Sequence, residues 1–267
     1  MDQSKIGDPM NILFTGARSG IAKDVIDKIK HKNVTIYVSV HTKSQLAEIK
    51  KIYQSNFNIH PLKLDITSKK DQEKLENLKI DILVCNAGVG YGGSISEMPM
   101  EKLRENFEVN VFSNFEIVQT VLKQMIERKE GRIIMMSSLA GIVPVPFLGG
   151  YCATKASIIK LAETLRMELK LLKTDIKMIL VEPGLYLTGF NRVMLENKYE
   201  DFETSYFKNQ EKVLRKKEDL FLHLLGKKNL DSISNCILKA IQKKHPKRVY
   251  RAPFSQKVGA FLYKVIS

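Results

Sequence analysis

Two hydroxyls and an amine stand at spacings suited to proton transfer in the stretch 137–155, SSLAGIVPVPFLGGYCATK. Tyr151 and Lys155 are four residues apart, so in a helix they share one face. A free phenol has a pKa near ~10, and because an adjacent ammonium favours the phenolate, Lys155 is predicted to lower the pKa of Tyr151. Ser138 follows the apolar run Ile133–Met136 and is expected at a strand end, where its hydroxyl can orient a substrate oxygen that Tyr151 protonates or deprotonates. A Tyr-x-x-x-Lys pair also occurs by chance on exposed helix faces, so whether this pair is catalytic has to be judged from the rest of the chain.

A glycine-containing turn follows the first apolar run of the chain. Met10–Phe14 has strand character, Thr15–Ala22 (TGARSGIA) contains two glycines, and a helical pattern starts at Ile21. Strand, glycine turn and helix together form the context in which backbone N–H groups bind a pyrophosphate. The spacing is G-x-x-x-G-x-A and not G-x-G-x-x-G, and a plain glycine turn is the alternative interpretation.

The end of the second predicted strand, Val34–Val40, bears on the choice of dinucleotide. In dinucleotide folds an acidic residue at this point holds the ribose 2′-hydroxyl, whereas basic residues accept a 2′-phosphate. This strand and the residues after it up to Gln45 contain no acidic residue. Arg18 in the glycine turn and His41 and Thr42 at the strand end therefore favour NADP(H) over NAD(H), the alternative being that these side chains face water.

The remaining chain alternates between strand and helix patterns. Strands are predicted over Ile59–Leu64, Ile80–Cys85, Gly131–Ser137 and Ile176–Glu182, and helices over Ser44–Tyr53, from near Lys69, and over Pro99–Arg128, Tyr151–Lys173 and Ser232–Lys244. Such alternation predicts right-handed crossovers and an α/β, doubly wound parallel sheet of about seven strands with helices on both faces. A chain of 267 residues with 44% hydrophobic residues is expected to form a single domain, 1–267.

Composition argues against several classes of protein. There is no apolar run of about 18 residues and no basic-plus-apolar leader, so neither a transmembrane helix nor a signal peptide is expected. Cys85, Cys152 and Cys236 lie far apart without metal-ligand spacing, so no metal site is expected, and the odd count suggests a reducing, cytoplasmic location. Cys152, beside the tyrosine, is interpreted as a small buried thiol. No DNA- or RNA-binding module is visible, so nucleic acid is not an expected partner.

Six features carry a resemblance to a known family: TGARSGIA at Thr15–Ala22, the triplet Asn86, Ala87 and Gly88, then Asn110, Ser138, Tyr151-x-x-x-Lys155, and Pro183-Gly184-x-x-x-Thr188. In order and spacing this set resembles the short-chain dehydrogenase/reductase family over about Met10–Thr188. One departure is Ala22, where the family usually carries a third glycine for close helix–strand packing. Dinucleotide fingerprints tolerate alanine at such a position.

The resemblance implies a role for each matching residue. Tyr151 would be the acid/base, Lys155 would lower the phenol pKa and bind the nicotinamide ribose, Ser138 would polarise the carbonyl, and Asn110 would hold a water in a proton relay. Cofactor contacts are implied for Gly16, Arg18, Ser19, Gly20 and Ile21 (phosphates and adenosine ribose), Asp65 and Ile66 (adenine), Asn86, Ala87 and Gly88 (ribose), and Pro183, Gly184 and Thr188 (nicotinamide). Asp65 could equally cap the helix expected near Lys69. Relatives commonly pair through two long helices, which implies a homodimer or homotetramer.

Two C-terminal segments lie beyond the resemblance. Residues 189–226 are charged, with Tyr199, Phe202, Tyr206 and Phe207 interleaved, and are expected to form a helical substrate lid that favours an apolar substrate. The formal net charge is +14, no acidic residue follows Asp231, and the tail 245–267 is basic. Within it Val258, Phe261, Leu262 and Val265 follow helical spacing, which is compatible with a peripheral membrane contact. A terminal helix docked on its own domain or on a sister subunit is the alternative.

These observations predict an NADP(H)-dependent oxidoreductase that interconverts a carbonyl and an alcohol by hydride transfer, on an apolar or lipid-like substrate. A non-catalytic dinucleotide-binding sensor on the same fold is the alternative function. Such a sensor would not need to keep Asn110, Ser138, Tyr151 and Lys155 together. A sugar-nucleotide epimerase or dehydratase is disfavoured by the loop spacing and the short C-terminal half.

Overall fold

Seven parallel strands form one sheet in the order β3-β2-β1-β4-β5-β6-β7. The computed structural model of the protein describes residues 9–198 and 202–266. The strands are β1 (Met10–Phe14), β2 (Val34–Val40), β3 (Ile59–Lys63), β4 (Ile82–Cys85), β5 (Glu130–Met136), β6 (Asp175–Pro183) and β7 (Val249–Ala252). The central strands read as continuous apolar runs because both of their faces are covered. The predicted doubly wound parallel sheet is confirmed.

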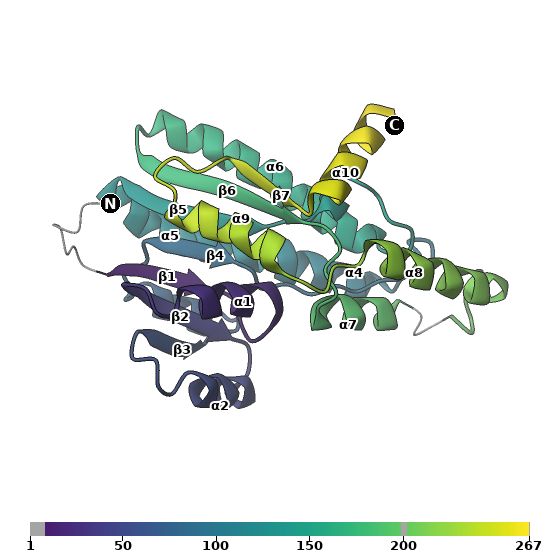
Figure 1. The fold of residues 1–267 in the computed structure, drawn as a ribbon, viewed down its shortest axis with the longest axis horizontal. Coiled ribbons are helices and arrows are strands. Elements are labelled where there is room, and N and C mark those ends of the chain that lie inside the picture. The colour runs from purple at the N-terminus through teal and green to yellow at the C-terminus, as the bar shows by residue number, and fades with distance from the viewer. Residues whose placement is uncertain (1–8, 199–201, 267) are drawn as a thin grey trace.

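Helices cover both faces of the sheet (Figure 1). One layer contains α1 (Gly20–Ile29), α2 (Lys43–Ile52) and α9 (Asp231–Gln242), and the other contains α4 (Met100–Phe107), α5 (Asn114–Arg128) and α6 (Gly149–Leu171), while α3 (Lys69–Gln72) is a single turn. Neighbouring residues of one strand serve opposite layers, since Phe14 packs in the cluster with α1 and Leu13 in the cluster with α5. This alternation follows from the two-residue repeat of a strand.

The segment predicted as one helix over Pro99–Arg128 contains an irregularity. A π-helical turn, Glu108–Ser113, separates α4 from α5. Such turns are rare and occur frequently at functional sites. This one contains Asn110, which is fully buried.

Three C-terminal helices lie beyond the carboxyl ends of the strands (Figure 1). They are α7 (Gly189–Asn197), α8 (Glu211–Leu225) and α10 (Phe254–Ile266). The strand β7 precedes α10 and lies in the basic tail 245–267, for which no strand was individually predicted. Within the described residues, no helix combines the length and the apolar character needed to cross a membrane.

Candidate active site

A cleft of about 1610 Å³ lies at the carboxyl ends of the strands. The order of strands reverses between β1 and β4, which is where open α/β sheets bind ligands. The predicted site residues that line this cleft are Gly16, Arg18, Ser19, Gly20, Ile21, His41, Asp65, Ile66, Asn86, Ala87, Gly88, Ser138, Tyr151, Lys155, Pro183, Gly184 and Thr188. Two predicted residues, Thr42 and Asn110, do not line it.

The glycine turn is fastened to the end of β4. The Thr15 hydroxyl accepts hydrogen bonds from the backbone N–H groups of Asn86 and Ala87, both at 3.0 Å, and the Asn86 amide donates to the Gly16 carbonyl at 2.9 Å. Gly16 has a φ of +61°, and a Cβ on it would lie 2.7 Å from the Ala87 Cα, so only glycine fits here. Thr15 is a positioning residue that the sequence reasoning missed.

The start of α1 suits an anion. Ser19 is the N-cap residue, and its side chain forms no capping hydrogen bond with the backbone N–H groups of the first turn. Gly20 and Ile21, in that turn, line the cleft, where such N–H groups can bind an anion. Ala22, where the family resemblance leads to an expected glycine, is buried in the core cluster. These features fit the phosphates of a dinucleotide.

Three asparagines spaced four residues apart hold the loop that follows β4. Each side chain forms hydrogen bonds with the backbone of one loop residue, and these loop residues alternate along the chain. The pairs are Asn106 with Tyr91, Asn110 with Val89 and Asn114 with Ala87. Asn110 uses both of its amide groups on Val89, at 2.8 Å each, and also donates to the Thr154 hydroxyl at 3.2 Å. Asn110 therefore lies behind the cleft and connects the loop to the turn of α6 that carries Lys155. The sequence reasoning missed Asn106 and Asn114, although the four-residue spacing of the three asparagines was visible in the sequence.

Ser138, Tyr151 and Lys155 converge at the middle of the cleft. Ser138 follows β5, and its hydroxyl accepts from the Ala140 N–H at 3.1 Å. Tyr151 and Lys155 lie one turn apart on α6, both buried, with the Lys155 Nζ 5.5 Å from the centre of the Tyr151 ring. The ammonium is held by the Met136 carbonyl at 3.0 Å. A proton donor, a hydroxyl that can bind the same oxygen and a cation are thus brought together.

Burial controls the protonation of this group. Burial raises the pKa of Tyr151, and the hydrogen bond with Ser138 lowers that pKa by less than burial raises it. Burial also lowers the pKa of Lys155 to about 8. The prediction that the pKa of Tyr151 is lowered is therefore wrong for the protein chain by itself, because desolvation of the phenolate outweighs the hydrogen bond with Ser138. The phenol is protonated at neutral pH.

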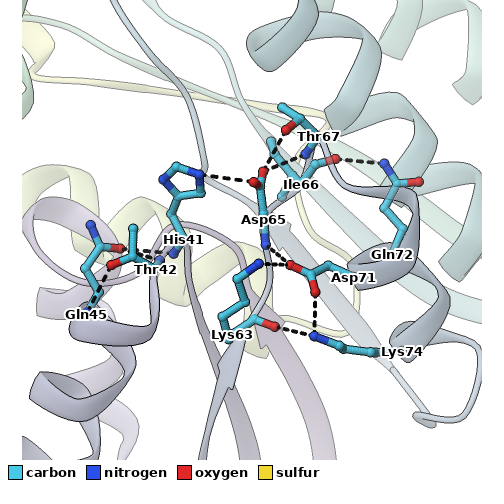
Figure 2. A network of polar contacts seen from close by, with 10 residues as sticks. All are labelled: His41, Thr42, Gln45, Lys63, Asp65, Ile66, Thr67, Asp71, Gln72 and Lys74. Atoms are coloured by element: carbon cyan, nitrogen blue, oxygen red, sulfur yellow. Dashed lines mark hydrogen bonds and ion pairs between the residues drawn. The ribbon is translucent and has the colours of Figure 1, made fainter.

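The end of the cleft predicted to hold adenosine contains a polar network (Figure 2). The His41 Nε2 lies 3.2 Å from the Asp65 carboxylate, which also accepts from the Thr67 N–H and hydroxyl. Partial burial opposes ionisation of Asp65, but the bonds from Thr67 and the charge of His41 outweigh it and hold the pKa of Asp65 below its ordinary value. Asp65 is thus bound to Thr67 and His41, and Ser68 is the N-cap residue of α3.

Thr42 has a structural role at the start of α2. Its hydroxyl accepts a hydrogen bond from the Gln45 N–H at 3.2 Å, and the Gln45 side chain accepts from the Thr42 N–H, which completes a capping box. The Thr42 hydroxyl is engaged in capping the start of α2, and Thr42 does not line the cleft.

Arg18 has a partner that the sequence did not indicate. Its Nε lies 3.0 Å from a carboxylate oxygen of Glu48, on α2, and both residues line the cleft. The two are 30 positions apart, so no local pattern predicts the contact. An acidic residue is consequently present beside the predicted adenosine site, although none occurs at the end of β2.

The opposite end of the cleft is apolar. Tyr151 packs in a cluster with Leu148, Cys152 and Met194, and the Phe190 ring lies 5.9 Å from the Tyr151 ring. Cys152 is a buried thiol, as predicted. Of the aromatic residues noted in 189–226, Phe202 and Phe207 pack on Phe147, Tyr206 is 86% exposed and Tyr199 lies outside the described residues. The helices α8 and α10 complete the wall, with Leu214, Phe221, Leu225, Gly259 and Tyr263 among its residues.

Comparison with known proteins identifies the family of this protein. Residues 10–198 match the family described as short chain dehydrogenase. The protein therefore belongs to the short-chain dehydrogenase/reductase family of oxidoreductases, which act on CH–OH and C=O groups.

Two relatives and one solved structure illustrate the similarity. The chain is 32% identical over 184 residues to an NADPH-dependent 3-dehydrocapnine reductase of Ornithobacterium rhinotracheale, which covers 64% of each protein. It is 27% identical over 256 residues to a 3-ketodihydrosphingosine reductase of Bacteroides thetaiotaomicron, covering 94% of this chain and 88% of the relative. The closed form of a serine dehydrogenase complexed with NADP+ has the same fold, with a TM-score of 0.77, 23% identity, and coverage of 92% of this chain and 96% of that one.

Proposed function

We propose that this protein is an NADP(H)-dependent oxidoreductase that interconverts a carbonyl and an alcohol on an apolar, lipid-like substrate. The observation that carries the proposal is the convergence of Ser138, Tyr151 and Lys155 in the cleft between a phosphate-binding turn and an apolar wall. A nicotinamide cofactor, when bound, supplies or accepts the hydride. The glycine turn would hold its phosphates, and Pro183, Gly184 and Thr188 would lie beside its nicotinamide.

The protein's own residues manage the proton. Tyr151 is protonated at neutral pH because burial raises its pKa, so its hydroxyl is ready to donate to a carbonyl oxygen. Ser138, which hydrogen-bonds with the phenol, would bind the same oxygen and polarise it. The Lys155 ammonium, whose pKa is about 8, offsets the negative charge that develops on the phenol oxygen.

Relatives and the wall of the cleft support a long-chain substrate. The reductase of B. thetaiotaomicron that matches 94% of this chain is named for a long-chain ketone, 3-ketodihydrosphingosine. The apolar residues around Tyr151, including Leu148, Phe190 and Met194, suit a hydrocarbon chain. We propose that α7 and α8 act as the substrate lid. A partly buried ion pair joins Lys198, at the C-terminal end of α7, to Glu218 on α8.

A panel of ketones with NADPH absorbance as the readout tests this function. We expect turnover that increases with chain length, includes 3-ketodihydrosphingosine, and is faster with NADPH than with NADH. A protein that binds NADPH but reduces no ketone of the panel would favour the sensor alternative over the enzyme.

Arg18→Ala is expected to weaken NADPH binding by about 10-fold or more and NADH binding by less than about 2-fold. The guanidinium would make charge-assisted hydrogen bonds to the 2′-phosphate, which contribute about 1.5–3 kcal/mol, and NADH lacks that group. Fluorescence titration of both cofactors measures the two dissociation constants. Equal losses for NADPH and NADH would remove Arg18 from the 2′-phosphate site.

We propose a peripheral membrane contact through α10, on the cytoplasmic side. Phe261 is 66% exposed and Leu262 52% exposed on this helix, while Gly259 and Tyr263 line the cleft, so a bilayer at α10 would border the substrate's entrance. The side chain of Val265 lies outside the described part of the structure. The basic tail favours anionic lipid.

Phe261→Glu is expected to reduce partitioning onto vesicles containing about 30% phosphatidylglycerol by at least about 10-fold, because one buried aromatic ring stabilises binding by about 1.5–3 kcal/mol. Leu171→Glu, at an 82% exposed position near the end of α6, is the matched control. Sedimentation with the vesicles measures both variants. If the two bind as wild type does, α10 is not the contact.

We also propose that the single domain assembles as a homodimer or homotetramer through the long helices α5 and α6 and the π-helical turn. Phe112 is 55% exposed and Leu161 43% exposed on this face. A second copy would cover these side chains.

A further inference from the structure

Each of the two basic residues expected to select NADP(H) is paired with a carboxylate in the folded protein. Arg18 contacts Glu48 at 3.0 Å and His41 contacts Asp65 at 3.2 Å. All four residues line the cleft. The charge presented to the adenosine ribose is therefore more balanced than the sequence around β2 suggests.

The fold gives Glu48 a fixed place beside this site. The capping box of Thr42 and Gln45 sets where α2 begins, and Ile49, which is fully buried, sets which face of the helix points to the core. Glu48 lies one turn after Gln45 and both line the cleft. Glu48 is the one acidic residue in the sequence of α2, whose other charged residues are lysines.

We propose that Glu48 is a specificity-determining residue that limits the preference for a 2′-phosphorylated cofactor by engaging Arg18. The proposal rests on the proposed function, since it requires a dinucleotide in this cleft. A 2′-phosphate carries close to two negative charges, so it competes with Glu48 for the guanidinium and is repelled by the carboxylate. A 2′-hydroxyl has no such charge and can donate a hydrogen bond to a carboxylate.

The Arg18–Glu48 pair is suited to such competition. The side chains of Arg18 and Glu48 are 52% and 45% exposed. Exposed ion pairs are weak and are screened by salt, so a ligand can replace one partner. Removing the charge of Glu48 should make the Arg18 guanidinium available to the 2′-phosphate without reducing the stability of the fold.

The test is Glu48→Gln, which keeps the shape of the side chain and removes its charge. Dissociation constants for NADPH and NADH are measured by fluorescence titration without substrate, at low salt and at about 0.5 M salt. We expect NADPH to bind about 3- to 10-fold more tightly at low salt, with NADH unchanged within about 2-fold or weaker. The gain for NADPH should shrink at high salt because the charges are screened.

Glu127→Gln is the matched control. Glu127 is an exposed carboxylate at the end of α5, next to the start of β5 and so at the opposite end of the sheet from the cleft. It loses the same charge and should leave both dissociation constants unchanged. A second control adds Glu48→Gln to Arg18→Ala, where the gain for NADPH should be smaller than in the wild-type background.

The outcomes separate the two proposals. NADPH binding that is unchanged or weaker in Glu48→Gln, with wild type binding NADPH normally, overturns the role of Glu48 and leaves the proposed function standing. It would mean that Glu48 orients Arg18 for the phosphate instead of competing with it. Failure of wild type to bind either cofactor overturns both.

Discussion

Tyr151→Phe is expected to reduce turnover by about 10²–10⁴-fold, the contribution typical of general acid catalysis, while changing the dissociation constant of NADPH by less than about 3-fold. The substitution removes one hydroxyl and keeps the ring, whose contact with Phe190 and packing against Leu148 and Met194 remain. The cleft should therefore keep its shape. Ketone reduction and fluorescence titration provide the two measurements.

Tyr206→Phe is the control for Tyr151→Phe. Tyr206 lies in the segment between α7 and α8 and is 86% exposed, so loss of its hydroxyl should affect neither quantity. Normal turnover by Tyr151→Phe would contradict the acid/base role. A large loss of NADPH affinity in that variant would instead assign the phenol to cofactor binding.

Lys155→Met is expected to reduce turnover by about 10²-fold or more and, at the same time, to raise the free energy of unfolding at pH 7. Burial lowers the pKa of Lys155 from 10.5 to about 8, which corresponds to a destabilisation of about 3 kcal/mol when the lysine is protonated. Methionine removes that cost but loses the hydrogen bond to Met136, worth about 1 kcal/mol. We expect a net gain of about 1–2 kcal/mol.

Because the pKa of Lys155 is lowered in the folded protein, the free energy of unfolding depends on pH. Between pH 8 and pH 10.5 the unfolded chain holds a proton on Lys155 that the folded protein has released. Wild-type stability should therefore rise with pH across this window, and Lys155→Met should lack that rise. Urea unfolding at pH 7 and at pH 10 measures it, with the advantage of the variant shrinking at pH 10.

Lys160→Met serves as the control for stability. Lys160 is on the same helix with its side chain 82% exposed, so its replacement should change the free energy of unfolding by less than about 0.5 kcal/mol. A Lys155→Met protein no more stable than wild type at pH 7 would show that burial of the ammonium is compensated by contacts other than Met136.

Local patterns were sufficient to predict the strands β1 to β6, most of the helices and the loops that face the cleft, but not the strand β7. The apolar runs of β1, β2 and β4 specify buried strands regardless of what surrounds them, and parallel strands must place their carboxyl ends at one edge. The turn after β1 and the residues after β4 and β5 consequently meet. What this reasoning missed was Thr15 and two members of the asparagine row, Asn106 and Asn114, although their four-residue spacing was visible.

Several features depend on distances and burial that no local pattern contains. Arg18 and Glu48 are 30 positions apart in the sequence. Their contact depends on the orientation of α2 about its own axis, which the burial of Ile49 fixes. The direction of the pKa shift of Tyr151 depends on how much water surrounds the phenol, which spacing to Lys155 does not reveal. The π-helical turn is likewise not visible in a local pattern, and it contains Asn110, which contacts Val89 and Thr154.

The sequence by itself determined the sheet, the order of the motifs and the residue proposed as proton donor, because these follow from periodicity and from the kinds of side chain present. The tertiary structure decided the protonation of Tyr151 and the charge at the end of the cleft predicted to hold adenosine. Both depend on desolvation and on contacts between elements that are distant in the chain, and these exist only after the helices have packed on the sheet.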